Sequence, residues 1–202
     1  MGSEMCIRDR IGLRASYDYL SPEHYQAAGK VHEILYWDRS NRFCPTCGTP
    51  LVQKESIMKK CPNCGREIYP VISTAILVLV RKEDSLLLVH ARNFKGTFNS
   101  LVAGFLETGE TLEECVAREV KEETGVSASI IKYIGKSSYS FNTPQDMVEK
   151  DVHWYLMMAD SYYSKPQREE HFVDSGYYKF YEAYHLLKFS NEKQILEKAY
   201  NE

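Results

Sequence analysis

Residues 104–126 read GFLETGETLEECVAREVKEETGV, and they predict a helix with a defined start and end. Thr111 and Glu114 form a capping box, because the side chain of each can bond to the backbone N–H of the other. The helix therefore begins at about residue 112. Gly125 follows Thr124 and predicts the end of the helix, since glycine takes the left-handed conformation that closes a helix at little cost.

This predicted helix has acidic side chains on the side that should face the core. At about 100° per residue, four apolar positions fall on one side: Leu112, Cys115, Val116 and Val120. Glu119, Glu122 and Glu123 fall on an arc that overlaps that side. Bare carboxylates placed there would repel one another and their pKa values would rise. A hard divalent cation such as Mg²⁺ would resolve the conflict; a merely acidic surface helix would instead place its acids opposite the apolar side.

The negative charge of the chain is concentrated in the same stretch. Residues 104–126 contain seven Glu and two Lys or Arg, a local net charge of −5, whereas the whole chain of 202 residues has a net charge of −3. The remaining residues therefore sum to +2. An acidic cluster in a mildly basic chain suggests a cation site that meets an anionic substrate.

Length and composition exclude several classes of protein. With 44% hydrophobic and 26% charged residues, the chain is globular rather than disordered. No apolar run approaches the roughly 20 residues that a membrane span needs. The net charge of −3 argues against binding to nucleic acid through bulk charge, but not against a local basic groove. Because no feature marks a secreted chain, we expect a cytoplasmic protein without membrane partners.

Four cysteines form two matching pairs, Cys44-Pro-Thr-Cys47-Gly and Cys61-Pro-Asn-Cys64-Gly. A CxxC turn brings two sulfurs together, and the glycine that follows permits the positive φ that closes the turn. Two such turns supply four thiolates in a tetrahedron, which suits one structural Zn²⁺ and leaves no position open for catalysis. A pair of disulfides and a redox-active CxxC stay open as alternatives.

The first ten residues, MGSEMCIRDR, resemble the translation of an adapter used to prepare sequencing libraries. We expect residues 1–10 to be an artefact and exclude them from the fold. The natural start of the protein, with any domain before it, is then expected upstream of residue 11.

The rest of the chain divides into three parts: an N-terminal helical segment at 11–40, a zinc ribbon at 41–70 and a larger domain at 71–202. Val71–Arg81, VISTAILVLVR, predicts a strand buried on both faces, because it is almost continuously apolar and β-branched. Further strands are expected at 86–90, 129–135 and 153–158, and helices at 22–37, 181–187 and 191–200.

Residues 104–126 also resemble the box that defines the Nudix family. The matching positions are Gly104, Glu110, Arg118, Glu119, Glu122, Glu123 and Gly125, with apolar Val120 and Val126. The resemblance implies an α/β/α sandwich with a mixed sheet. It also implies hydrolysis of a nucleoside diphosphate linked to another moiety, with Mg²⁺ or Mn²⁺.

The same resemblance implies roles for individual residues. Glu119, Glu122 and Glu123 would be metal ligands, joined by the carbonyl group of Gly104. Arg118 would pair with a neighbouring carboxylate and hold it in register. In addition, Glu110 would brace the turn before the helix, and Gly104 and Gly109 would permit a tight loop.

Hydrolysis of a diphosphate also needs a general base, because a carboxylate must remove the proton of the attacking water. Glu119 is one candidate. In other family members the base comes from a later loop, and Glu170 in the segment Arg168-Glu-Glu-His171 is the best-placed candidate of that kind. The alternative for Glu170 is a solvated loop acid.

From Trp37 onward, the chain resembles NADH pyrophosphatases, in which a zinc ribbon precedes the Nudix domain. Residues 37–44, WDRSNRFC, resemble the lead into that ribbon, and residues 101–107, LVAGFLE, resemble the start of that family's box. After the box the family has the signature SQPWPFP, whereas residues 137–143 here read SSYSFNT. The resemblance therefore implies a dinucleotide substrate and places the difference in specificity at 137–143.

Two aromatic residues remain in this segment, Tyr139 and Phe141. On an extended strand, residues two apart face the same side. The pair could therefore flank a planar ring of the substrate. The alternative is that both rings cover the core.

A second resemblance, to diadenosine polyphosphate hydrolases, lies in residues 148–156, VEKDVHWYL, and 187–198, LKFSNEKQILEK. Diadenosine polyphosphates are therefore one class of substrate to consider.

We expect a metal-dependent pyrophosphohydrolase of NADH- or NAD-like dinucleotides. Diadenosine polyphosphates, nucleotide sugars and nucleoside triphosphates are alternative substrates, and NAD-capped RNA is a further partner by family analogy. The alternative from another functional class is a zinc-ribbon protein that senses nucleotides without catalysis. A homodimer is one of the oligomeric states that we expect.

Overall fold

The structure of the chain is a computed structural model. It describes residues 11–92, 94, 97–142, 147–166, 168 and 171–200, with the backbone alone at 14, 138–142 and 147–150. Residues 1–10 and Glu170 lie outside these ranges. The chain forms two compact units, Met1–Ile72 with Ser138–Lys150 and Ser73–Ser137 with Asp151–Glu202.

The first unit begins with two helices, η2 (Arg14–Asp18) and α1 (Pro22–Ser40). α1 starts where the sequence predicts, because Pro22 takes the first helical position and Ser21 Oγ accepts a hydrogen bond from the backbone N–H of His24. It continues three residues beyond the predicted end at 37.

α1 buries few of its apolar side chains. Tyr25 is buried, as is Trp37 near the end of the helix. Val31 and Leu35 are exposed. The buried aromatic side chains of α1 therefore lie near its two ends.

Lys59 anchors the end of α1 to a three-stranded antiparallel sheet, β1 (Val52–Glu55), β2 (Met58–Lys60) and β3 (Glu67–Ile68), in that order. Its buried Nζ donates to the carbonyl oxygens of Asp38 and Asn41 at 2.6 and 2.9 Å. Nζ also pairs with Asp38 Oδ1 at 2.8 Å and lies 5.3 Å from the centre of the Trp37 ring. These contacts satisfy carbonyl groups that the end of a helix leaves open.

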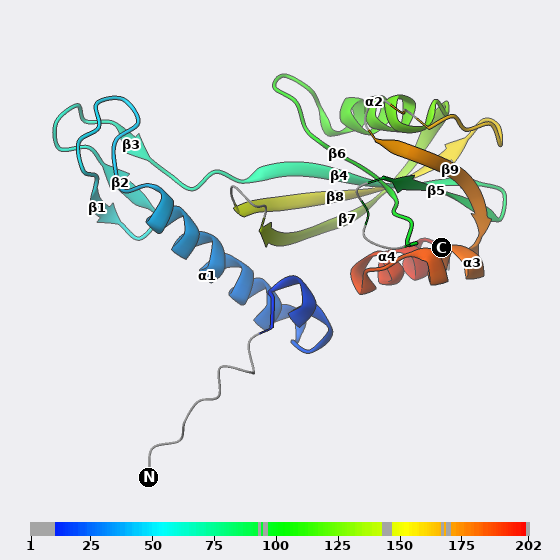
Figure 1. The fold of residues 1–202 in the computed structure, drawn as a ribbon, viewed down its shortest axis with the longest axis horizontal. Coiled ribbons are helices and arrows are strands. Elements are labelled where there is room, and N and C mark those ends of the chain that lie inside the picture. The colour runs from blue at the N-terminus through cyan, green and yellow to red at the C-terminus, as the bar shows by residue number, and fades with distance from the viewer. Residues whose placement is uncertain are drawn as a thin grey trace, which may run out of the picture. The chain divides into compact units, whose positions relative to one another are not determined.

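The second unit is built on a six-stranded sheet in the order β7-β8-β4-β5-β9, with β6 paired to β4 (Figure 1). Its strands are β4 (Ser73–Lys82), β5 (Ser85–Ala91), β6 (Val102–Phe105), β7 (Ala128–Asn142), β8 (Met147–Ala159) and β9 (Phe172–Lys179), although residues 138–142 of β7 and 147–150 of β8 belong to the first unit. Its helices are α2 (Leu112–Thr124), α3 (Phe180–Leu186) and α4 (Ser190–Tyr200). α2 lies on one face of the sheet, and α3 and α4 lie on the other (Figure 1).

β4 is the central strand, and residues 75–80 within it are all buried. Ile76, Val78 and Val80 pack in one core cluster with Val116 and Val120 of α2. Since successive side chains of a strand alternate between faces, the residues between them pack on the opposite face. The predicted strand with two buried faces is therefore confirmed.

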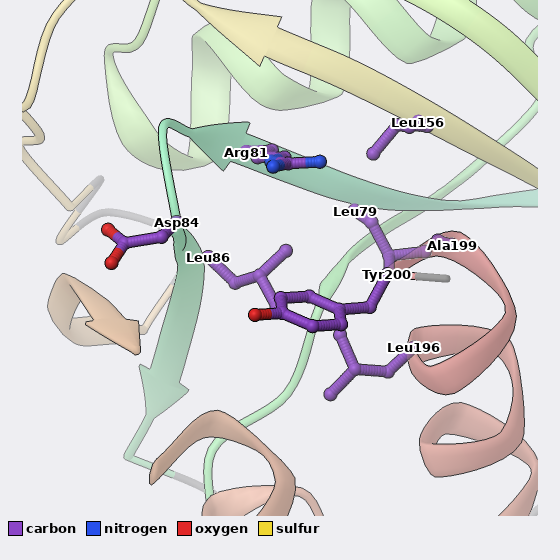
Figure 2. A pocket seen from close by; sticks show the side chains of 8 residues that line it. All are labelled: Leu79, Arg81, Asp84, Leu86, Leu156, Leu196, Ala199 and Tyr200. Carbon is purple, nitrogen blue, oxygen red and sulfur yellow. The ribbon is translucent and has the colours of Figure 1, made fainter. Parts of the chain in front are cut away.

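α4 covers that opposite face. A small pocket remains between this helix and the sheet (Figure 2), lined by Leu79, Arg81, Asp84, Leu86, Leu156, Leu196, Ala199 and Tyr200. Most of the residues that line the pocket are apolar. The two charged ones, Arg81 and Asp84, lie at the hairpin that joins β4 to β5. Leu196 is fully buried, so the contact between α4 and the sheet is part of the core.

The expected α/β/α sandwich is therefore confirmed. Among the described residues of the second unit, the strands β6 and β9 were not predicted, and the strands expected at 129–135 and 153–158 are longer at both ends; no individual strands were predicted within the ribbon. The two C-terminal helices lie within one residue of their predicted bounds. Among the described residues, none of the helices combines the length and apolar character that crossing a membrane requires.

Candidate functional site

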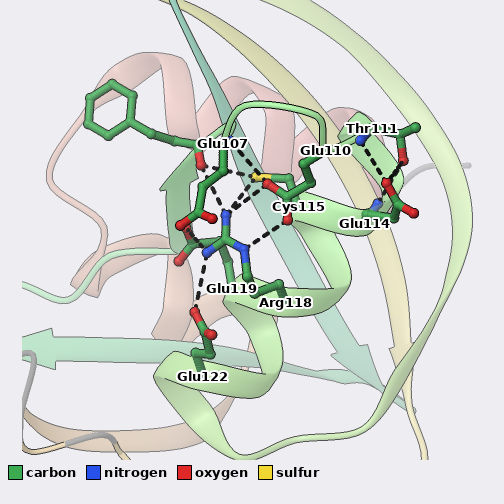
Figure 3. A network of polar contacts seen from close by, with 9 residues as sticks. Glu107, Glu110, Thr111, Glu114, Cys115, Arg118, Glu119 and Glu122 are labelled. Carbon is green, nitrogen blue, oxygen red and sulfur yellow. Dashed lines mark hydrogen bonds and ion pairs between the residues drawn. The ribbon is translucent and has the colours of Figure 1, made fainter.

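α2 has the two ends that its sequence predicts. Thr111 Oγ1 accepts a hydrogen bond from the backbone N–H of Glu114 at 3.2 Å, and Glu114 Oε2 accepts one from the N–H of Thr111 at 2.8 Å (Figure 3). At the other end Gly125 has a φ of 68°, and its N–H bonds to the carbonyl of Lys121. The predicted capping box and left-handed stop are both present.

Arg118 is the centre of a network of carboxylates (Figure 3). Its Nε and Nη2 donate to Oε1 and Oε2 of Glu110 at 2.8 and 2.9 Å. Its Nη1 donates to Glu119 Oε1 at 2.9 Å and to Glu122 Oε2 at 3.2 Å. Nη2 also donates to the carbonyl oxygen of Phe105 at 3.1 Å. One guanidinium therefore fixes three acids of α2 and its preceding loop relative to β6.

The network determines the charge of its members. Hydrogen bonds from Arg118 lower the pKa of Glu110 to about 2. In return, its bonds to Glu110 and then to Glu119 raise the pKa of Arg118 above its ordinary value. Glu110 also accepts a bond from the backbone N–H of Glu107 at 3.1 Å, so it braces the loop before α2.

The acids of α2 lie partly on its buried side. Glu119 and Glu123 are 9% and 5% exposed, whereas Glu122 is exposed. Cys115, Val116 and Val120 of the same helix belong to the core or are fully buried. The overlap between the acidic arc and the apolar side is therefore real for two of the three glutamates.

Gly104 lies directly beside Glu119. It is part of β6 and pairs with Ile76 of β4. A Cβ atom at position 104 would lie 1.9 Å from Cδ and 2.0 Å from Oε1 of Glu119. Gly104 is therefore needed for space rather than for an unusual backbone conformation, and the backbone at this point lies against a carboxylate. The positive φ of 90° belongs to Gly109 in the loop.

The three glutamates do not by themselves form a compact ligand cluster. Within the part of the chain that the structure describes, the only group of three or more acidic, His or Cys ligands with all ligand atoms within 4.8 Å is the four cysteines. Arg118 instead holds Glu119 and Glu122. The donor types present, carboxylates beside a strand backbone, are nevertheless those that a hard divalent cation prefers.

The four cysteines of the first unit do form a compact cluster. Cys44 Sγ lies 3.5 Å from Cys64 Sγ, and Cys47 Sγ lies 3.5 Å from Cys61 Sγ. Tetrahedral zinc with Zn–S bonds of about 2.3 Å would separate its sulfurs by about 3.8 Å. All four are free thiols, so neither disulfide is present. The site fits one zinc ion with four sulfur ligands.

The two cysteine turns have the same backbone geometry. The N–H of Cys44 bonds to the carbonyl of Thr49, and the N–H of Gly48 bonds back to the carbonyl of Cys44. Cys61 and Gly65 repeat this pattern. Gly48 and Gly65 have φ values of 72° and 77°, which explains why a glycine follows each pair.

Three other candidates are not placed by the structure. Glu170 lies outside the described residues. Tyr139 and Phe141 lie on β7, where the backbone alone is described. The main contact that the sequence did not reveal is the Phe105 carbonyl that bonds Arg118, because a backbone acceptor leaves no signal in the residue type.

Two family models match the chain. Residues 71–198 match the NUDIX domain, and residues 39–69 match the NADH pyrophosphatase zinc ribbon domain. A structural comparison agrees for the fold: the crystal structure of a NUDIX hydrolase from Nitrosomonas europaea superposes with a TM-score of 0.61 at 18% identity, over 79% of this chain and 93% of that one.

Curated relatives share more of the sequence. The chain is 38% identical over 152 residues to the NAD-capped RNA hydrolase NudC of Chromobacterium violaceum, covering 69% of this chain and 57% of the relative. It is 41% identical over 148 residues to the NAD-capped RNA hydrolase NudC of Pseudomonas aeruginosa, covering 65% of this chain and 53% of the relative. The chain therefore spans about half the length of the curated relatives it matches.

Proposed function

The chain belongs to the NUDIX domain family, and on that premise we propose that it is a divalent-metal-dependent pyrophosphohydrolase of NAD-like dinucleotides. The observation that carries the proposal is that Arg118 forms ion pairs with both Glu110 and Glu119, while the Glu119 side chain packs against Gly104. This arrangement holds a carboxylate from the middle of the acidic helix beside the backbone of β6. No apolar packing requirement explains it.

We propose that Glu119, Glu122, Glu123 and the Gly104 carbonyl would hold the cation, Mg²⁺ or Mn²⁺. When bound, such an ion neutralises the charge of a diphosphate and lowers the pKa of a bound water. The donor chemistry fits, since hard divalent cations prefer oxygen ligands. Glu119 and Glu123 are both buried, so a cation held there would lie largely out of water, where its attraction to the carboxylates is stronger.

The protein side chains have separate tasks in this proposal. Arg118 orients Glu119 through one Nη1 hydrogen bond, and Glu110 fixes the guanidinium by accepting two. A carboxylate removes the proton of the attacking water as it approaches phosphorus. Glu119 is the candidate base within the described residues, and Glu170 is the second candidate.

The zinc ribbon has a structural role. Its four sulfurs leave no coordination position for a substrate or water. Four cysteines that hold zinc rather than form disulfides are typical of proteins whose thiols stay reduced, and on this ground a cytoplasmic location is part of the proposal.

NAD-like dinucleotides are proposed as substrates for two reasons. Residues 39–69 match the NADH pyrophosphatase zinc ribbon domain. The relatives from Chromobacterium and Pseudomonas are named NAD-capped RNA hydrolases. NAD-capped RNA is therefore part of the proposal. We place discrimination in residues 137–143, where Tyr139 and Phe141 are two apart in the sequence; on an extended strand they would share one face and flank a planar ring.

A panel of substrates tests this proposal. NADH, NAD, diadenosine tetraphosphate, a nucleotide sugar and NAD-capped RNA should be incubated with the protein and Mg²⁺ or Mn²⁺, and mononucleotide release should be measured. We expect the highest kcat/KM for an NAD-containing substrate. A preference for diadenosine tetraphosphate would replace the proposed substrate class, and no turnover of any compound would favour a nucleotide-binding sensor. Light scattering of the same sample would establish whether the protein is a homodimer.

A further inference from the structure

The zinc ribbon, residues 39–69, is far more positive than the rest of the chain. It contains six Lys or Arg and two Glu, a formal charge of +4. Since the whole chain has a net charge of −3, the other residues sum to −7. Four thiolates with one Zn²⁺ would reduce the ribbon to +2, which still has the opposite sign. Such an asymmetry within one chain is typical of a segment that contacts a polyanion.

Most of these Lys and Arg side chains are accessible to a ligand, although Arg66 Nη1 also donates to Thr46 Oγ1 at 2.8 Å. Lys59 is buried and bonds to the end of α1, so it is not available. The other five bases are at the surface of the first unit: Arg39, Arg42, Lys54, Lys60 and Arg66. Lys60 pairs with Glu67 while remaining 43% exposed. Exposed bases of this kind can neutralise phosphates by displacing their counterions.

Two aromatic rings of the ribbon are also exposed. Phe43 is 59% exposed and follows Arg42 directly. Tyr69 is 49% exposed, and its hydroxyl donates to Glu67 Oε2, whose other oxygen pairs with Lys60. More than half of the Phe43 ring is therefore open to a ligand. Proteins bind the unpaired nucleobases of single strands by stacking them on aromatic rings, with Lys and Arg side chains nearby to contact the phosphates.

We propose that the ribbon binds single-stranded nucleic acid. In this account Phe43 and Tyr69 stack on bases, and the surface Lys and Arg residues contact phosphates. An acidic peptide would satisfy the charge but gives no reason for two exposed rings. The identity of the natural ligand rests on the proposed function: it would be the RNA chain that follows an NAD cap. The ribbon would then contribute to recognition of the substrate beyond the cap.

The direct test measures binding without hydrolysis. A fluorescent uncapped oligouridylate of about 12 nucleotides, within the range of small single-strand-binding modules, is titrated with the full chain in zinc-containing buffer without Mg²⁺. Fluorescence anisotropy should show binding that weakens with salt. Phe43→Ala and Tyr69→Ala should each raise the Kd about fivefold or more, the lower end for loss of one stacked base. Tyr69→Phe keeps the ring and should bind like the parent.

Arg42→Gln should weaken binding and reduce the dependence of log Kd on log salt by roughly 0.7, as expected for one lost phosphate contact on a single strand. Matched controls come from the second unit. Tyr181→Ala removes a ring that is 73% exposed, and Lys179→Gln removes an exposed base. Both controls should leave the Kd unchanged. Zinc content and melting temperature of every variant should be measured, so that a loss of the ribbon is recognised.

Three results would overturn the inference. The first is a parent protein that does not bind the oligonucleotide at low salt. The second is equal binding by the parent and by correctly folded Phe43→Ala, Tyr69→Ala and Arg42→Gln variants. The third is a competition experiment in which polyglutamate displaces the labelled RNA as effectively as unlabelled RNA of equal charge does. That result would indicate a site for acidic proteins.

A kinetic comparison separates this inference from the proposed function. Tyr69→Ala should raise the KM for NAD-capped RNA about fivefold or more and leave the KM for free NAD unchanged. Equal changes for both substrates would contradict a role for the ribbon in binding the RNA chain. If the parent cleaves neither substrate, the proposed function fails while the anisotropy result stands independently.

Discussion

Arg118 and Glu110 form a two-pronged ion pair, with Nε to Oε1 at 2.8 Å and Nη2 to Oε2 at 2.9 Å. The pair joins the loop before α2 to the middle of that helix. It also leaves Nη1 of Arg118 directed at Glu119 and Glu122. A planar guanidinium can make these contacts at once because its donors have a fixed fork geometry.

Arg118→Lys should therefore separate charge from geometry. Lysine keeps the positive charge but cannot form the two parallel bonds to Glu110 while bonding Glu119. We expect kcat/KM to fall about 10- to 100-fold, as for other residues that orient a metal ligand. Steady-state kinetics checks this, and melting curves control for unfolding. Full activity of Arg118→Lys would show that positive charge alone is sufficient.

Gly104→Ala should reduce activity more than stability. The added methyl group would meet the end of the Glu119 side chain, which is flexible and can move away. Moving this carboxylate should lower kcat about tenfold or more, since small displacements of reacting groups are costly. Gly176→Ala is the matched control, because a Cβ there would make only ordinary contacts of 3.5 Å or more. A large fall in melting temperature without loss of activity would contradict this explanation.

The Arg118–Glu110 pair should also make stability depend on pH. The pKa of Glu110 is lowered from 4.5 to about 2, so the folded state favours the ionised carboxyl. This contribution is complete above about pH 5 and is lost as pH falls through the folded pKa. The difference in melting temperature between the parent and Glu110→Gln should therefore shrink from pH 6 toward pH 3. A difference that grows on acidification would contradict the assignment.

Zinc should be required for the first unit and not for the chemistry. Elemental analysis of protein purified without chelator should give one zinc per chain. Cys44→Ser should lower the stability of the ribbon by several kcal/mol, because small zinc modules have little core without metal. Its kcat on a free dinucleotide should change far less. Protein without zinc, or a Cys44→Ser variant with unchanged stability, would be inconsistent with this role.

The parts of the fold that the sequence predicts are those with strong local signals. α2 has a capping box and a glycine stop, and β4 has an unbroken apolar run. β6 and β9 were missed for physical reasons. β6 has only four residues and includes Gly104, while β9, FVDSGYYK, is an edge strand without continuous burial. Short or partly exposed strands depend on neighbours that are distant in sequence.

The site was predictable to a similar degree. Periodicity placed Glu119, Glu122 and Glu123 near the core, which is correct for Glu119 and Glu123 but wrong for the exposed Glu122, and the cysteine spacing predicted the cysteine cluster. Gly104 was expected to permit a tight loop. In the structure it instead leaves space for the Glu119 side chain, which lies against β6. The bond between Arg118 and the Phe105 carbonyl likewise requires the three-dimensional position of β6. Packing between separate elements is the information that a local pattern lacks.

The most direct test of the account is NADH hydrolysis by the parent and by Glu123→Gln, each with Mg²⁺ and with EDTA. Glutamine is nearly the same size as glutamate, so this change removes the charge of a carboxylate that is 5% exposed with little change in volume. The account predicts turnover by the parent only with the metal, and a kcat for Glu123→Gln at least about 100-fold lower. Turnover in EDTA equal to that in Mg²⁺, or an unimpaired Glu123→Gln variant, would contradict it.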